Sequence, residues 1–214
     1  MKYTAVIFDF DGTVADTGRG ITNCVRYALE KLGRPVPGMD VLKKFVGPPL
    51  YESFRNFCGL GHDEAEQGVA LYRERYSITG LFECDLYPGF EALVRELNAR
   101  GAYVAVASGK PEMYLRRIID SFGMTDCFRA VAGPDPSSHS SDKRGQVLAV
   151  LPEGCRPEDA CMVGDRCFDV DAGRALGMHT VAVEYGYGSR GEFEASGADE
   201  IAATVEELSE ILLG

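Results

Sequence analysis

Short apolar runs recur along this chain, and each ends in polar residues or glycine. Four of them are almost uninterrupted: 3–10 (YTAVIFDF), 103–108 (YVAVAS), 160–165 (ACMVGD) and 179–185 (HTVAVEY). A fifth, 128–133 (FRAVAG), is weaker. A strand that is apolar on both faces is typical of a parallel sheet covered by helices on both sides. The pattern therefore predicts strands at these five places.

Segments with the apolar spacing of a helix lie between and after these runs. Strands that alternate with helices indicate a doubly wound α/β fold, in which a parallel, Rossmann-like sheet is sandwiched between helices. The predicted helices are 89–100, 111–122, 142–151, 169–176 and 205–213.

One block breaks the alternation, because residues 17–83 contain no convincing strand. Its segments read as helices, and each of them ends in glycine: 20–33, 40–47, 50–59 and 63–80. We interpret residues 17–83 as an inserted α-helical cap domain. Residues 1–16 and 84–214 would then form the α/β core domain.

Polar side chains that could do chemistry gather where the predicted strands end. In open parallel sheets, ligands bind outside the carboxyl ends of the strands. Lys143, at the start of the helix over 142–151, could reach the same edge. The strand-end residues are Asp9 and Asp11 after the first strand, Ser108, Gly109 and Lys110 after the second, and Asp165 and Asp169 after the fourth.

The convergence of four carboxylates at one edge indicates a cation. A single Asp after a strand is usually a cap or turn residue, which is how we interpret Asp16 and Asp171. Four neighbouring carboxylates, however, repel one another unless positive charge lies among them. Hard oxygen ligands without nearby His or Cys favour Mg2+ over zinc.

An aspartate held by Mg2+ can attack a phosphoryl group and form an aspartyl-phosphate, which is the role we predict for Asp9. Asp11, two residues on, could protonate the leaving oxygen and then activate water. Ser108 and nearby backbone N–H groups could hold the phosphoryl oxygens. Lys143 would neutralise charge that develops during transfer.

Composition narrows the range of partners. The chain has 214 residues, a formal charge of -11 and a pI near 4.8, which argues against nucleic acid or an anionic membrane as the main partner. Its seven cysteines are scattered, which disfavours a disulfide framework and a zinc site. Without a signal-peptide pattern or a membrane-spanning run, we expect a cytoplasmic protein, either a monomer or a homodimer.

Four motifs appear in order: DFDGT (9–13), VAVASGK (104–110), Lys143 and VGDRCFD (163–169). Together they resemble the haloacid dehalogenase-like superfamily, in particular its phosphatase branch. The helical block at 17–83 is similar to the small cap that this superfamily inserts after its first motif. Further stretches, such as GPPLYESF at 47–54, resemble the phosphoglycolate phosphatase-like subgroup, which also contains nucleotidases and pyrophosphatases.

The resemblance implies a role for each matching residue. Two departures from the subgroup are visible: it often has Thr-Ser or Thr-Asn where this chain has Ser108–Gly109, and the loop before Lys143 is atypical. The implied roles are nucleophile and metal ligand for Asp9, general acid/base for Asp11 with its backbone carbonyl on the metal, phosphate binding for Ser108 and Gly109, charge neutralisation for Lys143, metal ligation for Asp165, and direct or supporting ligation for Asp169.

These observations predict a Mg2+-dependent phosphatase that hydrolyses a small phosphorylated metabolite. A phosphomutase or a pyrophosphatase on the same fold is an alternative, and so is a catalytically idle binding or regulatory protein. A dehalogenase is disfavoured, because displacing halide needs no proton donor such as Asp11. The substrate stays open; cap residues that could select it are Arg19, Arg26, Lys43 and the turn at 47–50.

Overall fold

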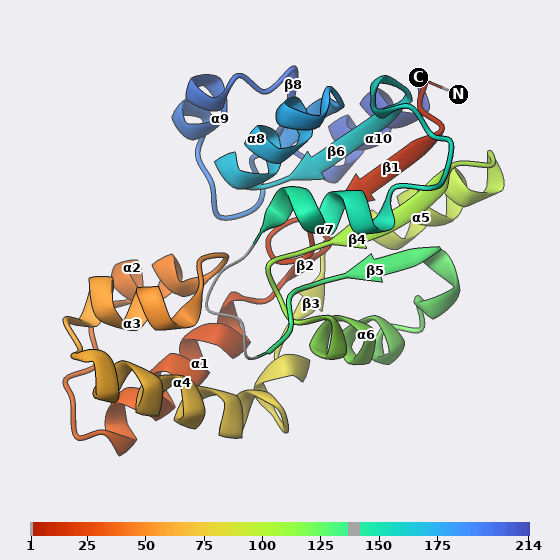
Figure 1. Ribbon diagram of the computed structural model, residues 1–214. Coiled ribbons are helices and arrows are strands. Elements are labelled where there is room, and N and C mark those ends of the chain that lie inside the picture. Colours follow the sequence, from red (N-terminus) through yellow and green to blue (C-terminus); the bar gives the residue numbers. More distant parts are fainter. Residues whose placement is uncertain (1, 137–141) are drawn as a thin grey trace.

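A parallel sheet of six strands lies at the centre of the protein, in the order β5-β4-β1-β6-β7-β8 (Figure 1). The computed structural model describes residues 2–136 and 142–214. After β1 the chain forms β4 and β5 on one side of it and then β6, β7 and β8 on the other side. The direction in which strands are added therefore reverses next to β1, and ligands bind at such a switch point in folds of this kind. The strands are β1 (Ala5–Phe8), β4 (Tyr103–Ala107), β5 (Ala130–Ala132), β6 (Ala160–Gly164), β7 (His179–Val183) and β8 (Glu200–Ala202).

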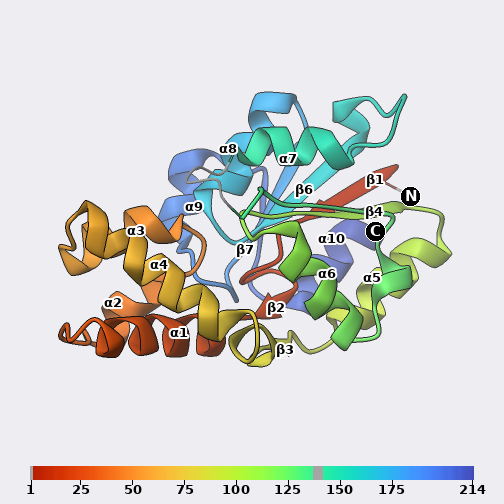
Figure 2. The ribbon, with the colours of Figure 1, turned by 60° about the horizontal axis from the view of Figure 1, so that its bottom comes forward.

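Helices cover both faces of the sheet (Figure 2). Two lie on one face, α7 (Lys143–Val150) and α8 (Cys167–Leu176), and α9 (Arg190–Ser196) packs against α8. The other face carries three helices: α5 (Phe90–Ala99), α6 (Glu112–Ser121) and α10 (Val205–Leu213). Two short 3-10 turns complete the core, η3 (Thr125–Cys127) and η4 (Pro157–Asp159).

Alternation along β1 explains why its sequence is apolar throughout. Ile7 packs in the cluster that contains Val147 of α7, whereas Phe8 packs in the larger cluster on the opposite face. There its ring meets Phe90 edge-on, with centroids 5.1 Å apart, and Leu97 belongs to the same cluster. Successive strand residues point to opposite faces, so both sets are buried.

The helical insertion leaves and rejoins the sheet domain through a short antiparallel ribbon of β2 (Ala15–Asp16) and β3 (Asp85–Leu86). It lies beside the end of the sheet toward which β1 and β6 point (Figure 1). Within it, α4 packs against both α1 and α3. Its elements are α1 (Gly18–Lys31), α2 (Met39–Leu42), η1 (Lys43–Phe45), α3 (Leu50–Cys58), α4 (His62–Tyr76) and η2 (Gly80–Phe82).

The predicted α/β fold with an inserted helical region is confirmed. All five predicted strands form, although the weak segment 128–133 contributes only Ala130–Ala132. The edge strand β8 and the ribbon were not predicted, because two or three residues carry too little periodicity to be recognised. The exact domain boundaries at 17 and 83 stay a prediction. Residues 137–141, with His139, lie outside the described residues.

We expect Phe8→Ala to lower the free energy of unfolding by about 3–5 kcal/mol, because it leaves a cavity in a close-packed core. Phe8 is fully buried. Urea unfolding followed by circular dichroism measures the loss. Ile78→Ala is the control: Ile78 is 72% exposed, so the free energy should change by less than about 0.5 kcal/mol. A similar loss for both variants would contradict the described packing.

Candidate active site

The loop after β1 presents two carboxylates at the edge of the sheet. Asp9 still pairs with the sheet, because its N–H donates to the carbonyl of Val163 at 2.8 Å. Asp11 follows, and both side chains are largely buried. The chain then turns at Gly12, whose φ is +84°; a Cβ there would lie 2.1 Å from Oδ2 of Asp165. Glycine thus permits both the turn and the close approach to a third carboxylate.

The loop after β6 supplies that carboxylate and a fourth one. Asp165 is fully buried, and its Oδ2 accepts the N–H of Tyr187 at 2.7 Å. Its Oδ1 has no hydrogen-bond partner among the described residues. Asp169, in the first turn of α8, accepts the N–H of Arg166 through Oδ2 at 3.0 Å. A Cβ on Gly164 would lie 2.2 Å from the Asp169 carboxyl carbon, so glycine lets this helix start close to the strand.

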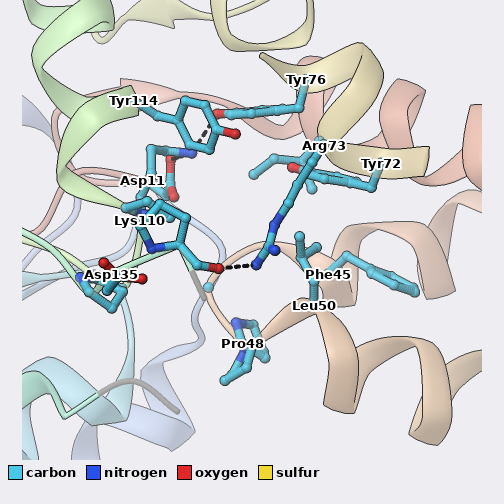
Figure 3. Close-up of a pocket in the computed structure, with 17 residues that line it drawn as sticks. Asp11, Phe45, Pro48, Leu50, Tyr72, Arg73, Tyr76, Lys110, Tyr114 and Asp135 are labelled. Atoms are coloured by element: carbon cyan, nitrogen blue, oxygen red, sulfur yellow. Dashed lines mark hydrogen bonds and ion pairs between the residues drawn. The ribbon is translucent and has the colours of Figure 1, made fainter. Parts of the chain in front are cut away.

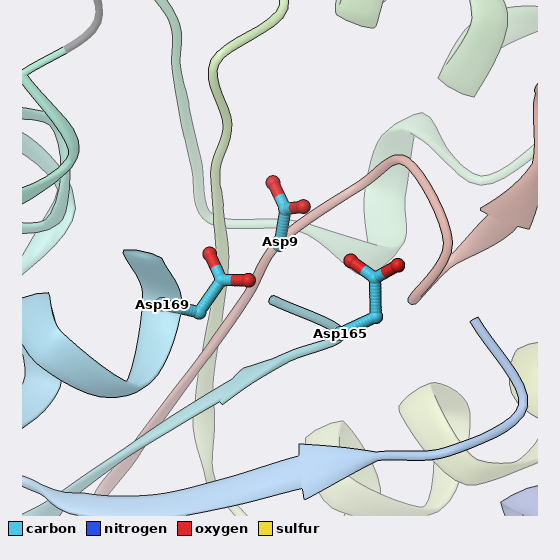
Figure 4. A group of neighbouring side chains, drawn as sticks. All are labelled: Asp9, Asp165 and Asp169. Carbon is cyan, nitrogen blue, oxygen red and sulfur yellow. The ribbon is translucent and has the colours of Figure 1, made fainter. Parts of the chain in front are cut away.

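Three of these carboxylates form one cluster (Figure 4). Asp9, Asp165 and Asp169 each offer an oxygen within 4.8 Å of the others. Burial raises the pKa of Asp165 well above its usual range, and the charges of Asp9 and Asp169 add to the rise. Burial also raises the pKa of Asp169 to about 6, although Lys143 opposes it. Without a cation, the cluster therefore resists full ionisation.

Lys143, the first residue of α7, reaches this cluster. Its Nζ lies 2.7 Å from Oδ1 of Asp9 and 2.6 Å from Oδ1 of Asp169. Burial lowers the pKa of Lys143, but the two carboxylates outweigh it and the pKa lies above its usual value. The helix start is set by Asp142, whose side chain accepts the N–H of Gly145 at 3.0 Å. The predicted lysine thus lies where the sequence expected it.

The loop after β4 closes the same cavity. Ser108 is buried, and its N–H donates to the carbonyl of Ala132 at 3.0 Å. The N–H of Lys110 donates to Ser108 Oγ at 3.3 Å. The structure brings the predicted residues of three strand ends into one place. The cavity is lined by Asp9, Asp11, Gly47, Pro48, Pro49, Ser108, Gly109, Lys110, Lys143, Arg166, Phe168 and Asp169.

Lys110 is a site residue to which the sequence assigned no role. Its Nζ lies 2.9 Å from Oδ1 of Asp11 and donates to the hydroxyl of Tyr76 at 2.6 Å. Thr17 donates to the same Asp11 oxygen at 2.7 Å. The only signal in the sequence was a lysine at the end of a buried strand; its partner Tyr76 comes from the insertion, which no local pattern connects to it.

The charges of the cavity fit a divalent cation. When ionised, the carboxylates of Asp9, Asp11, Asp165 and Asp169 exceed the ammonium groups of Lys110 and Lys143 by two charges, while Arg166, which also lines the cavity, pairs with Glu192 at 3.0 Å. Oxygen donors are those that hard divalent cations prefer. The unpartnered Oδ1 of Asp165 is a ligand atom without a protein partner. Asp9, Asp165 and Asp169 are therefore suited to hold a metal ion.

A second cleft adjoins this cavity on the side of the insertion (Figure 3). Its walls carry aromatic side chains of both parts of the protein, and the guanidinium of Arg73 donates to the carbonyl of Pro136 across it. The two hollows share lining residues, so they are continuous. The shared residues are Asp11, Gly47, Pro48, Pro49, Gly109 and Lys110.

Of the cap residues that the sequence singled out, only the turn at 47–50 lines these hollows. Arg19 pairs instead with Asp85 at 3.1 Å, and both side chains are largely exposed. Arg26 and Lys43 are exposed and line neither hollow. Of the candidates left open by the sequence, these three basic residues therefore lie away from the site, on the solvent side of the insertion.

Tyr187 joins the carboxylate cluster to the start of the insertion. Its N–H binds Asp165, while its hydroxyl donates to Asp16 and accepts the N–H of Gly18 at 2.7 Å. Asp16 also accepts the Gly18 N–H, at 3.1 Å, as expected of a turn residue. Asp171 is exposed, in line with its interpretation as a solvated residue. Tyr187 was not predicted, because its partners are more than 20 residues away.

All seven cysteines are free, as expected. Cys161 is buried in the sheet, and Cys167 is partly buried at the start of α8.

Among the described residues, no helix combines the length and the apolar character needed to cross a bilayer. The predictions of compartment and oligomeric state stay predictions.

Comparison with known proteins identifies the family. Residues 6–183 match the model of the haloacid dehalogenase-like hydrolase family. The chain belongs to this family. Among curated relatives, a 5′-nucleotidase of Pseudomonas aeruginosa is 33% identical over 99% of this chain and 96% of its own length. The tyrosine-protein kinase PtkA of Mycobacterium tuberculosis is 38% identical over 97% of this chain and 72% of its own length.

Solved structures agree with this assignment to the haloacid dehalogenase-like hydrolases. The crystal structure of a predicted phosphatase from Clostridium acetobutylicum superimposes with a TM-score of 0.92 and is 33% identical. It covers 100% of this chain, and this chain covers 99% of it. Sheet and helical insertion therefore both belong to the shared family architecture.

We expect Mg2+ to raise the Tm of the wild-type protein by about 5 °C or more at saturation, because it binds only the folded cluster. Asp165→Asn should abolish that rise. The amide can still accept the Tyr187 N–H, and its NH2 group can donate to the neighbouring carboxylates, so the fold should persist in EDTA. Thermal unfolding in EDTA and in Mg2+ measures both effects.

Asp171→Asn is the matched control, because it removes an exposed carboxylate two residues beyond Asp169 on the same helix. It should keep the full response to Mg2+. An undiminished Mg2+ response in Asp165→Asn would show that the ion binds elsewhere.

Proposed function

We propose that this protein is a Mg2+-dependent phosphatase that hydrolyses a small phosphorylated metabolite through an aspartyl-phosphate on Asp9. The observation that carries the proposal is the environment of Asp9. Its carboxylate lines a cavity at the switch point of the sheet, is held through Oδ1 by Lys143, and lies in a cluster suited to a divalent cation. Asp11 lines the same cavity.

In the first step, a carboxylate oxygen of Asp9 attacks phosphorus, and the bond from phosphorus to the ester oxygen breaks. The departing oxygen takes a proton from Asp11, so an alcohol leaves. A bound Mg2+, held by Asp9, Asp165 and Asp169 and by the Asp11 backbone carbonyl, would supply positive charge against the phosphoryl oxygens. Lys143 keeps Asp9 in place and adds a second positive charge.

In the second step, Asp11 accepts a proton from water, which then attacks the phosphorus of the aspartyl-phosphate. The bond between phosphorus and the Asp9 oxygen breaks, which releases inorganic phosphate and restores both aspartates. Ser108 Oγ and the backbone N–H of Gly109 would hold the phosphoryl oxygens during both steps; both residues line the cavity. Asp169 fixes Lys143 through a 2.6 Å contact.

The relatives support phosphoryl chemistry but carry different names. They include a 5′-nucleotidase, phosphoglycolate phosphatases and a tyrosine-protein kinase. Hydrolysis of a monoester accounts for the position of Asp11, which lines the same cavity as Asp9. A pyrophosphatase or phosphomutase would use the same two aspartates on another substrate, so a panel of phosphorylated metabolites distinguishes these readings. Transfer from ATP to tyrosine would instead appear as phosphotyrosine on an added protein.

We expect Asp9→Asn to lose at least about 1,000-fold in turnover of p-nitrophenyl phosphate with Mg2+, because an amide cannot attack phosphorus. The wild-type protein should give an acid-stable, base-labile phosphoprotein when the reaction is quenched rapidly, and the variant should not. Its circular dichroism should match the wild type. Turnover of the wild type should stop in EDTA.

Asp171→Asn serves again as the control and should keep its turnover. If Asp9→Asn retained a substantial fraction of wild-type turnover, a covalent mechanism through Asp9 would be ruled out. Full wild-type turnover in excess EDTA would rule out the metal.

A further inference from the structure

We infer that the cleft beside the catalytic cavity binds the leaving group, and that it selects an uncharged leaving group with a planar aromatic ring. Nucleoside 5′-monophosphates belong to this class of phosphate ester. The inference rests on the proposed phosphatase function and adds the substrate class to it. Three properties of the cleft carry it: its position, its walls and its charge.

The position follows from the lining residues that the two hollows share. Asp11 and Lys110 line both, so they stand at the passage between the phosphoryl site and the cleft. Asp11 is the residue that would protonate the leaving oxygen. A substrate with its phosphorus near Asp9 and its ester oxygen near Asp11 must therefore extend its remaining atoms toward the cleft.

Four of the residues that line the cleft are aromatic (Figure 3). Phe45, Tyr72 and Tyr76 come from the insertion, and Tyr114 comes from α6 of the sheet domain. Tyr72 and Tyr76 stack with an interplanar angle of 16°, which gives a preformed flat assembly. Each of these rings is held in place by burial, so little ordering is needed when a ligand binds. Flat aromatic groups stack well on such surfaces.

The charges of the cleft balance. Lys110 is already paired with Asp11, and Arg73 donates to the carbonyl of Pro136. Asp135 also lines the cleft and brings a second carboxylate. Two cations and two anions leave no net field that would favour an anionic leaving group such as glycolate.

The test compares esters that differ in one part only. Adenosine 5′-monophosphate and ribose 5-phosphate share the phosphate and the ribose, and only the first carries a base. We expect kcat/KM to be about ten-fold or more higher for the nucleotide, the gain typical of stacking one base on aromatic side chains. Phosphoglycolate should be poorer still. Equal values for the two ribose esters, or a preference for phosphoglycolate, would overturn the inference.

A variant that fills the cleft sharpens the comparison. Leu50 is partly buried, lines the cleft and does not line the catalytic cavity. Leu50→Trp should therefore lower kcat/KM for adenosine 5′-monophosphate about ten-fold while it leaves ribose 5-phosphate within about two-fold. Ile78→Trp, on the exposed surface of the insertion, should change neither. An equal loss for both esters in Leu50→Trp would contradict binding of the base in the cleft.

Binding measurements separate this inference from the proposed function. Calorimetry on the Asp9→Asn protein with Mg2+ should show tighter binding of adenosine 5′-monophosphate than of ribose 5-phosphate. A protein that binds the nucleotide preferentially but hydrolyses no ester would refute the phosphatase function and keep the cleft assignment. A protein that hydrolyses both ribose esters equally, without a binding preference, would support the phosphatase function and refute the cleft assignment.

A separate observation concerns how the insertion reaches Asp11. Oδ1 of Asp11 receives two donors, Lys110 at 2.9 Å and Thr17 at 2.7 Å. Its Oδ2 accepts no hydrogen bond from the part of the chain that the structure describes, so it is the oxygen left for proton transfer. Lys110 is itself held by the hydroxyl of Tyr76 at 2.6 Å, and its Nζ lies 4.9 Å from the centre of that ring.

We propose that Tyr76 is a positioning residue, which acts through Lys110 to hold Asp11 in place for proton transfer. Tyr76 is the last residue of α4, whereas Lys110 and Asp11 belong to the sheet domain. An ammonium group has three donors, and two of them are directed by Asp11 and Tyr76. The orientation of the proton donor therefore depends on contact between the insertion and the sheet domain.

The test is the dependence of rate on the leaving group. Tyr76→Phe removes the hydroxyl and keeps the ring and its stacking. Because kcat/KM reports steps up to departure of the leaving group, a misplaced proton donor should lower it most for poor leaving groups. We expect about a ten-fold loss with an alkyl phosphate and less than about two-fold with p-nitrophenyl phosphate. The slope of log(kcat/KM) against leaving-group pKa should become steeper.

Two further variants frame the result. Asp11→Asn should make the slope of log(kcat/KM) against leaving-group pKa steeper still than Tyr76→Phe does. Tyr27→Phe removes another tyrosine hydroxyl of the insertion, which contacts Glu74 of α4 at 2.5 Å, and should leave the slope unchanged. If Tyr76→Phe slowed all esters equally, or slowed none, Tyr76 would be a packing residue and the positioning role would be wrong.

Discussion

Buried negative charge is the constraint on which this site depends. The ends of β1 and β6 place Asp9 and Asp165 side by side with Asp169, where their oxygens lie within 4.8 Å of one another. Desolvation makes such a cluster unfavourable unless positive charge compensates it. Lys143 supplies part of that charge, and the remaining excess suits a divalent cation. The same uncompensated charge that makes the cluster costly for folding suits it to a metal ion, and a bound metal ion would in turn attract phosphoryl oxygens.

The second constraint is that one site is built from two parts of the chain. The sheet domain provides the carboxylates and Lys143, whereas the insertion adds the wall of the neighbouring cleft and the hydroxyl of Tyr76. Lys110 lies between them, with Asp11 on one side and Tyr76 on the other. A charged group that is buried between two structural units has a defined position only when both are in contact, so the site is complete only in that arrangement.

This division explains what family membership does and does not reveal. Relatives that match most of this chain bear names as different as 5′-nucleotidase and phosphoglycolate phosphatase. In the mechanism that we propose, phosphoryl transfer would depend on residues at the strand ends, whose positions follow from the geometry of the parallel sheet. On the cleft assignment that we propose, discrimination among substrates would depend on side chains such as Tyr72 and Arg73, which line the cleft and not the cavity that holds Asp9.

The sequence by itself determined the α/β fold, the helical insertion and the candidate residues of the strand ends, because apolar runs and the residues that end them are local patterns. Asp9, Asp11, Ser108, Asp165 and Asp169 could be named for that reason. Only the tertiary structure decided that Lys110 bridges Asp11 and Tyr76, and that Arg19, Arg26 and Lys43 face solvent instead of the site. Such contacts join residues tens of positions apart, and they depend on how helices pack, which no periodicity along the chain records.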